Sequence, residues 1–330
     1  MEIRPFAAQD DLALGELLHD PATPADLVAR GLLRPDQDSP VLRSVAAVID
    51  DTDDPAAAGS GVVVGAAVLA EAPVHPTRAW AHVEVADTER RRGVGRRLLA
   101  GARAHAAGTP LAGLPLRARV AAGSTGDEVL RHLGAAELFR TRVIRVEPGT
   151  LAGLGHGREE DFAVTTTGSV VLTQLFGEWY AGVNRKDPAA EMSVGEVNRR
   201  FLSEATGAHG AAMLRRDGGV SGFAVSYARP VSEEQVEQIE EAGEEYPATE
   251  LTLASLYDAR VADVTTIDRE SAEYQAALGD AAVLVASLSL ETPVEIEVTS
   301  EMPVVTELLD GLVSAGQARV LYEYVTYGPE

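Results

Sequence analysis

The chain has 330 residues, enough for two hydrophobic cores, and 45% of them are hydrophobic while only 5% are aromatic. It has no cysteine, which excludes disulfides, zinc thiolates and a covalent cysteine intermediate, and its net charge of −23 argues against nucleic acid as a partner. No apolar run reaches membrane-spanning length and the N-terminus lacks a signal pattern, so we expect a cytoplasmic protein with no membrane partner.

The first 150 residues alternate between strand and helix patterns. A short strand opens the chain, followed by a helix that carries Leu12, Leu14, Leu17 and Leu18. The Asp-, Pro- and Gly-rich run 50–61 predicts a turn or hairpin loop. Two further helices are predicted at 96–108 and 126–134. The remaining strands are predicted at 43–50, 62–73, 79–86, 114–122 and 136–149.

After a polar join at 153–161, a similar order recurs. A hairpin is predicted to turn at Asp217-Gly218-Gly219, and Ser193 with Glu196 predicts a capped helix start. Further helices are predicted at 171–184, 270–290 and 304–316, and strands at 250–258, 293–298 and 318–327. We therefore predict two copies of one α/β unit, with Trp80 and Trp179 in the cores or between the lobes.

The span from Arg90 to Arg96 has four arginines and two glycines, between a predicted strand and a predicted helix. The N–H groups of a first helical turn have no partner within the helix, and the helix dipole adds positive charge there. Gly93 and Gly95 let the backbone approach a ligand, and arginine binds phosphate bidentately. The loop is therefore predicted to bind a pyrophosphate. It is neither a Walker loop nor a dinucleotide fingerprint, because the Lys-Ser/Thr pair and the third glycine are missing.

The pattern R-x-x-G-x-G from Arg90 to Gly95 resembles the acyl-CoA-binding motif of the GNAT (GCN5-related N-acetyltransferase) superfamily. In that family the motif follows the fourth strand and opens the third helix, and an apolar pair like Val83 and Val85 precedes it. The resemblance covers residues 1–148 well. It implies an α/β fold of two tandem GNAT-like lobes, each a mixed twisted β-sheet flanked by helices. The N-terminal domain would span 1–150 and a degenerate C-terminal one 160–330.

The resemblance also implies acetyl-CoA as co-substrate and no metal. The pantetheine arm would pair with backbone groups of the strand, and the arginine-rich loop would wrap the pyrophosphate. A main-chain N–H near the end of strand 79–86 would polarise the acyl carbonyl, and an amine would attack it directly. The cofactor-binding residues implied in this way are Val83, Glu84, Val85, Arg90, Arg91, Arg92, Gly93, Val94, Gly95 and Arg96.

The catalytic positions of the family are not matched. Leu130 stands where the family often has a tyrosine acid, Ala79 and Ala81 stand where a base is frequent, and Gly123 replaces a frequent asparagine. The catalytic residues therefore stay unknown, and the candidates for a base are Glu71, His75 and Glu84.

Strand alternation sends His82 and Glu84 to the face opposite Ala79 and Ala81. This placement favours an ion-paired or structural Glu84 and a half-buried strand histidine at position 82.

The second lobe lacks such a loop and carries most of the negative charge. Residues 1–150 have 17 Arg against 20 Asp and Glu, whereas residues 151–330 have 11 Lys and Arg against 31 Asp and Glu. No glycine lies between Gly243 and Gly279, so we expect no CoA site in this lobe. The seven glutamates of 232–247 predict a solvated helix or a rim that attracts cations.

The leading function is transfer of an acetyl group from acetyl-CoA to the amine of a small, possibly cationic molecule by the N-terminal lobe of a monomer or homodimer. One alternative is a CoA-binding or interaction protein without turnover. Another is an acyltransferase that uses a longer or acidic acyl-CoA. Arg117 and Arg119 would face such an acyl group, or else they are surface charges.

Overall fold

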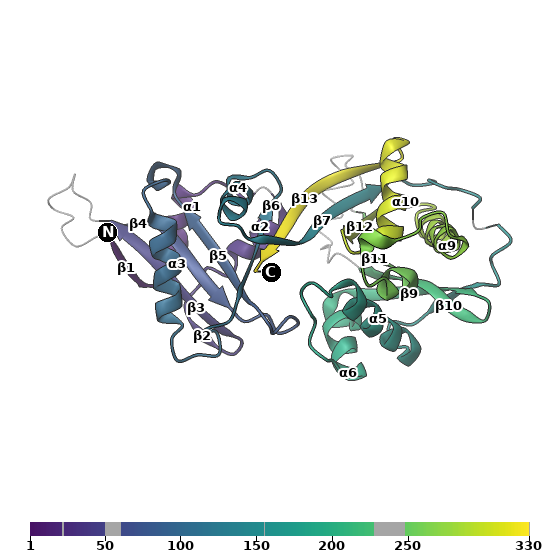
Figure 1. The fold of residues 1–330 in the computed structure, drawn as a ribbon, viewed down its shortest axis with the longest axis horizontal. Helices are drawn as coiled ribbons and strands as arrows, with labels where there is room; N and C mark the ends of the chain where they lie inside the picture. Colours follow the sequence, from purple (N-terminus) through teal and green to yellow (C-terminus); the bar gives the residue numbers. More distant parts are fainter. Residues whose placement is uncertain (22, 50–60, 155, 228–247, 330) are drawn as a thin grey trace, which may run out of the picture. The chain divides into compact units, whose positions relative to one another are not determined.

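A computed structural model describes residues 1–21, 23–49, 61–154, 156–227 and 248–329 of the chain, which forms two compact units (Figure 1). Unit 1 consists of Met1–Leu138 and Tyr324–Glu330, and unit 2 of Phe139–Glu323. The first boundary lies before the join expected at residues 150–160, because residues 141–146 pair with residues 294–299 of unit 2. The last strand returns to unit 1. The predicted loop 50–61, apart from Gly61, and the glutamate-rich segment 232–247 lie outside the described residues.

Unit 1 contains one mixed sheet with strand order β1-β3-β4-β5-β6-β13, and β2 pairs with β3. Its strands are β1 (Glu2–Pro5), β2 (Gln37–Asp38), β3 (Val41–Ile49), β4 (Val62–Ala70), β5 (Ala79–Val85), β6 (Leu116–Ala121) and the end of β13 (Ala318–Gly328). Its helices are α1 (Asp10–Leu17), α2 (Pro24–Arg30), α3 (Val94–His105) and α4 (Thr125–His132).

Two apolar layers cover the sheet of unit 1. Leu98 and Ala102 of α3 pack with Ala67 of β4 and Ala79 of β5 on one face. On the other face, Leu14 of α1 packs with Ala66 and Val68 of β4 and with Trp80 of β5. The alternation of β5 therefore puts Trp80 on the face opposite α3, as strand periodicity requires. Helix α2 was not predicted, although Thr23 caps it by accepting the Asp26 N–H and Pro24 occupies its first turn.

Unit 2 repeats this order with strand order β13-β7-β12-β11-β10-β9-β8. Its strands are β7 (Ala136–Val146), β8 (Phe162–Thr165), β9 (Ala208–Arg216), β10 (Gly219–Tyr227), β11 (Thr249–Ser255), β12 (Val294–Thr299) and the start of β13. Its helices are α5 (Val170–Val183), α6 (Val194–Val197), α8 (Leu256–Arg260), α9 (Ala272–Leu288) and α10 (Pro303–Ser314).

Most sequence predictions for unit 2 are confirmed. Ser193 and Glu196 form a reciprocal capping box, and the hairpin turns at Asp217 and Gly218, both with positive φ. Two predictions were wrong. Strand β8 was missed, and residues 256–258 were predicted as strand but form the start of α8.

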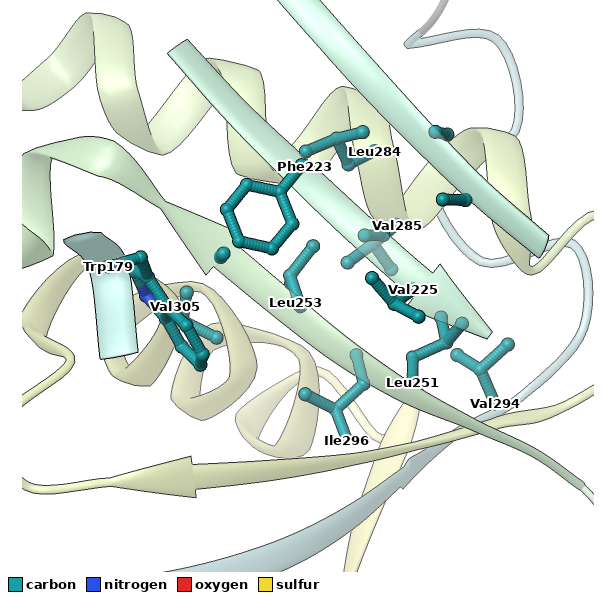
Figure 2. Close-up of a cluster of buried hydrophobic side chains, with 14 of the residues drawn as sticks. Trp179, Phe223, Val225, Leu251, Leu253, Leu284, Val285, Val294, Ile296 and Val305 are labelled. Atoms are coloured by element: carbon teal, nitrogen blue, oxygen red, sulfur yellow. The ribbon is translucent and has the colours of Figure 1, made fainter. Parts of the chain in front are cut away.

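The core of unit 2 gathers side chains from the sheet and from helices that include α5, α9 and α10 (Figure 2). Three neighbouring strands contribute Phe223, Leu253 and Ile296. The helices α5 and α10 contribute Trp179 and Val305 to the same cluster. Trp179 packs edge-on against Phe223 with ring centroids 5.8 Å apart. The prediction of a core position for Trp179 is therefore confirmed.

One packing detail recurs at matching positions of the two units. A Cβ on Gly65 of β4 would lie 2.7 Å from the Glu84 carbonyl oxygen and 3.1 Å from Leu98 of α3. A Cβ on Gly222 of β10 would lie 2.8 Å from the Ala254 carbonyl oxygen and 3.1 Å from Leu284 of α9. Both glycines therefore allow one strand to approach its neighbour where the following helix crosses. This match makes β5 and α3 the counterparts of β11 and α9.

Candidate functional site

Strands β5 and β6 separate soon after they begin to pair. They are parallel and in register only at Ala79 with Leu116 and at Trp80 with Arg117. Strand β5 stays paired with β4 as far as Val85. From Ala81 to Val85, β5 is therefore paired on one side only.

The backbone groups on the open side of β5 can be assigned from the ladder. The Ala86 N–H donates to Val64 of β4, and the Ala79 N–H donates to Pro115 on the β6 side. Because N–H and C=O directions alternate along a strand, the N–H and C=O of Val83 and Val85 also face the β6 side. Those of Glu84 face β4. The Val85 carbonyl accepts a hydrogen bond from the Arg90 side chain at 3.1 Å. An extended ligand beside β5 would thus find the N–H and C=O of Val83 and the N–H of Val85 available.

Helix α3 begins directly beyond this open edge. Its N-cap Gly93 has φ +78°, and Arg91 also has a positive φ of 61°. The first hydrogen bond of the helix runs from the Arg97 N–H to the Gly93 carbonyl. The amides of Val94, Gly95 and Arg96 therefore precede the helical ladder, at the positive end of the helix dipole. Gly95 faces Val83 and Val85, and a Cβ there would lie 3.7 Å from the nearest of their atoms.

The arginines of this loop fall into two pairs. Arg90 and Arg92 are held by the preceding 3₁₀ turn, in ion pairs of 2.7 Å with Asp87 and 3.1 Å with Glu89. Arg91 and Arg96 are exposed, and no residue that the structure describes forms an ion pair with either of them. Two guanidinium groups at the helix start are thus available to a phosphate.

A charged cluster lies on the other face of β5, opposite α3. The Glu84 carboxylate accepts hydrogen bonds from Arg30 of α2 at 3.1 Å and pairs with the His82 ring at 2.8 Å. Burial opposes ionisation of Glu84, but the hydrogen bonds from His82 and Arg30 outweigh it and keep the Glu84 pKa below its usual value. Glu84 is therefore ion-paired, as the sequence analysis favoured, and is a weak base. The link between His82, Glu84 and Arg30 was not predicted, because Arg30 lies on the missed helix α2.

The other candidate bases lie elsewhere in unit 1. Glu71 follows the end of β4 and accepts a hydrogen bond from the Val41 N–H of β3 at 3.1 Å. His75 is buried in the turn that precedes β5, where its backbone N–H donates to the Ala72 carbonyl. The structure brings neither of them together with Val83 and Val85.

A tyrosine does contact α4, but it comes from the last strand. Tyr327 of β13 donates a hydrogen bond to Asp127, and burial together with this bond raises the pKa of Tyr327 to about 12. Sequence reasoning missed this contact because it joins residues far apart in the chain. The bond fastens β13 to α4, and Leu130 of the same helix has no ionisable group.

The matching region of unit 2 is built differently. Strands β11 and β12 also pair over a short stretch, from Thr249 to Leu251. Beyond it, the buried Asp258 of α8 accepts hydrogen bonds from the Val304 and Val305 N–H groups at the start of α10. Tyr274 of α9 is fully buried and packs with Val304. The Tyr274 hydroxyl also donates to the Pro303 carbonyl at 3.2 Å, so the starts of α9 and α10 are linked in unit 2.

Within the described part of the chain, no helix is long and apolar enough to cross a membrane. In the same residues, no group of three His, Asp or Glu side chains is arranged to hold a metal ion.

No protein-family model matches the sequence, and no curated protein matches it either. Solved structures do match. One is a GCN5-related N-acetyltransferase from Sphaerobacter thermophilus, with 15% identity, a TM-score of 0.57 and coverage of 100% of this chain and 95% of that one. Another is the GCN5-related glucosamine N-acetyltransferase region of a fungal multi-domain GH3 beta-N-acetylglucosaminidase. It has 12% identity, a TM-score of 0.57 and coverage of 99% of this chain and 38% of that one.

At these identities the likeness is one of fold. The predicted α/β architecture of GNAT type is confirmed, and it extends over the whole chain.

Proposed function

We propose that unit 1 is an acetyl-CoA-dependent N-acetyltransferase that acts on the amine of a small molecule. The observation that carries the proposal is the conjunction of an open edge on β5 with the glycine-containing start of α3. The fold supports acyl transfer in general, and the local geometry supports a CoA thioester as the acyl donor.

The residues of unit 1 fit the parts of CoA. The main chain of Val83 and the N–H of Val85 can pair with the amides of the pantetheine arm, as an added strand would. The free amides of Val94, Gly95 and Arg96 and the guanidinium groups of Arg91 and Arg96 match the charge of a pyrophosphate. Gly95 has no Cβ to separate the phosphate from the helix start.

The chemistry proposed is direct transfer. The amine nitrogen attacks the thioester carbonyl, a C–N bond forms, the C–S bond breaks, and CoA leaves as the thiolate. A main-chain N–H on the open side of β5 would stabilise the developing oxyanion, and one such donor is worth about 3 kcal/mol. The amine proton must pass to a base.

We propose His82 as that base, with Glu84 as its positioning residue. A His82 tautomer that donates from Nε2 to Glu84 keeps an unprotonated Nδ1. Glu84 itself is held by Arg30 and is less suited to accept a proton. This proposal replaces the candidates Glu71, whose carboxylate accepts a hydrogen bond from β3, and His75, which is buried in the turn before β5.

Thermal unfolding with acetyl-CoA tests the binding step. Acetyl-CoA should raise the melting temperature of the wild-type protein, and replacing both Arg91 and Arg96 by Glu should remove the rise. Arg103→Glu is the matched control, because Arg103 is an exposed arginine in the last turn of the same helix. No rise for the wild type at saturating acetyl-CoA would refute the CoA site.

Thiol release over a panel of amines tests the reaction. His82→Gln should lower kcat by about 100-fold or more, while the acetyl-CoA melting shift stays. A normal melting shift with no thiol release for any amine would favour the alternative, a CoA-binding protein without turnover.

A further inference from the structure

Arg117 and Arg119 of β6 surround the ring of Trp80. The Arg117 guanidinium lies 3.6 Å from the Trp80 ring centroid, and the Arg119 guanidinium lies 5.3 Å from it. Arg119 also lies 4.3 Å from the ring centroid of Tyr324 on β13. Arg117 is only 5% exposed, so the interpretation of Arg117 as a surface charge is wrong, and Arg119 is half-buried.

Two guanidinium groups against one indole ring concentrate positive charge in a poorly solvated place. Cation–π contacts offset part of the desolvation cost of each arginine, but they add no negative charge. Among the residues that the structure describes, Arg119 forms no ion pair or hydrogen bond, and its Nε atom is buried without a partner. The carboxylate of Glu84, on the same face of the sheet, is already bound by Arg30 and His82. The guanidinium group of Arg119 therefore has N–H donors to which no described residue offers an acceptor.

Arg119 also stands at the place where β5 and β6 part. The last paired residues are Trp80 and Arg117. Arg119 lies two residues beyond Arg117, and His82 lies two residues beyond Trp80. Both arginines reach Trp80, so they share its face of the sheet, and strand alternation puts His82 on that face too. The Arg119 guanidinium and the proposed base His82 thus lie on one face of the sheet, each two residues beyond the last paired residues of β5 and β6.

We propose that Arg119, supported by Arg117 and Trp80, binds a carboxylate of the substrate. This inference rests on the proposed function, which it makes specific: the substrate carries a carboxylate close to the reacting amine or acyl group. An arginine fork matches a carboxylate bidentately, and the aromatic rings hold the fork in place. The carboxylate has two possible sources, an amino-acid-like acceptor or the acyl chain of a dicarboxylic acyl-CoA.

Two arms of one experiment distinguish the sources. The first compares L-phenylalanine with phenethylamine as acceptors for acetyl-CoA. The second compares succinyl-CoA with butyryl-CoA on a single amine. A preference of about 10-fold or more for the carboxylate member is expected in one arm, and Arg119→Met should abolish it. Arg119→Lys, which keeps the charge but not the fork, should retain only part of it. Arg103→Met is the control and should leave the preference unchanged.

A binding readout separates this inference from the proposed function. In a Trp179→Phe background, Trp80 is the only tryptophan and reports directly on the arginine cluster. Titration with succinate should change its fluorescence, and Arg119→Met should remove the change, whether or not the protein turns over acetyl-CoA. The inference is overturned if acyl transfer occurs with no carboxylate preference in either arm, or if succinate binds equally well to the Arg119→Met protein.

Discussion

Gly65 and Gly95 of unit 1 have different roles. Gly65 of β4 faces the backbone of Glu84, so the close approach of β4 to β5 depends on it. Gly95 meets only ordinary contacts with Val83 and Val85, so the fold does not require a glycine there. A glycine that the fold does not need, at the start of a helix beside an open strand edge, points to a ligand.

This difference predicts opposite outcomes for two alanine variants. Gly65→Ala should lower the free energy of unfolding by about 1 to 3 kcal/mol, because the new methyl group displaces the Glu84 carbonyl. Gly95→Ala should leave the unfolding free energy unchanged or slightly higher, since alanine favours a helix, yet it should weaken the acetyl-CoA melting shift. Urea denaturation and ligand titration measure both effects. A Gly95→Ala protein with an undiminished shift would contradict the assignment of this helix start to the phosphate.

One half of the candidate site could be predicted from the sequence, and the other half could not. The glycine and arginine loop is local, so its pattern and its place between strand and helix could be recognised directly. The cluster of His82, Glu84 and Arg30 joins β5 to a helix seven residues long, and that helix was missed. The stacking of Arg117 and Arg119 on Trp80 depends on the register of β5 and β6, which single-sequence patterns do not determine.

Equivalent elements of the two units have diverged at one connection. From β5 the chain reaches the N-cap of α3 at Gly93, whereas from β11 it passes through α8 before the N-cap of α9 at Ser271. The added residues include Asp258, which caps α10 from outside that helix. The expectation that the second lobe binds no CoA stays a prediction, supported by this internal contact and by the burial of Tyr274.

The Asp258 contact predicts a specific dependence of stability on pH. Burial raises the Asp258 pKa to about 7, and the hydrogen bonds from Val304 and Val305 offset only part of the shift. The folded protein therefore favours the protonated acid. The contribution of protonated Asp258 to the free energy of unfolding is complete below the unfolded pKa near 4. This contribution is lost as the pH rises through 7, by up to about 1.4 kcal/mol per pH unit.

Asp258→Asn should flatten the dependence of the unfolding free energy between pH 5 and 8, because the amide does not ionise. Asp258→Ala is the comparison, since it removes the acceptor and should destabilise the protein at every pH. Denaturant unfolding at several pH values measures both. A wild-type slope that survives in Asp258→Asn would show that other groups cause it.

At the scale of the whole molecule, the order of elements could be predicted from the sequence. The path of the last strand, which starts in unit 2 and ends in unit 1, could not. Hydrophobic periodicity identified β13 as a strand, but it carries no information about which unit its two ends join. Residues 318–323 belong to unit 2, while Tyr324, Val325, Thr326 and Tyr327 pair with β6 in unit 1. We therefore expect the folding of unit 1 to depend on Tyr324, Val325, Thr326 and Tyr327.

Ending the chain after Glu323 tests this dependence. The truncation removes Tyr324, Val325 and Tyr327, all nearly fully buried, together with the hydrogen bond to Asp127. It leaves β6 as an uncovered edge, which promotes aggregation. Unit 1, followed by Trp80 fluorescence, should unfold at a lower temperature and lose its acetyl-CoA response, whereas Trp179 fluorescence should report a smaller change in unit 2. Tyr327→Phe keeps the strand and removes only the hydrogen bond, so it should cost no more than about 3 kcal/mol. If the truncated chain kept the acetyl-CoA melting shift of the intact protein, the last strand would not be part of the working unit 1.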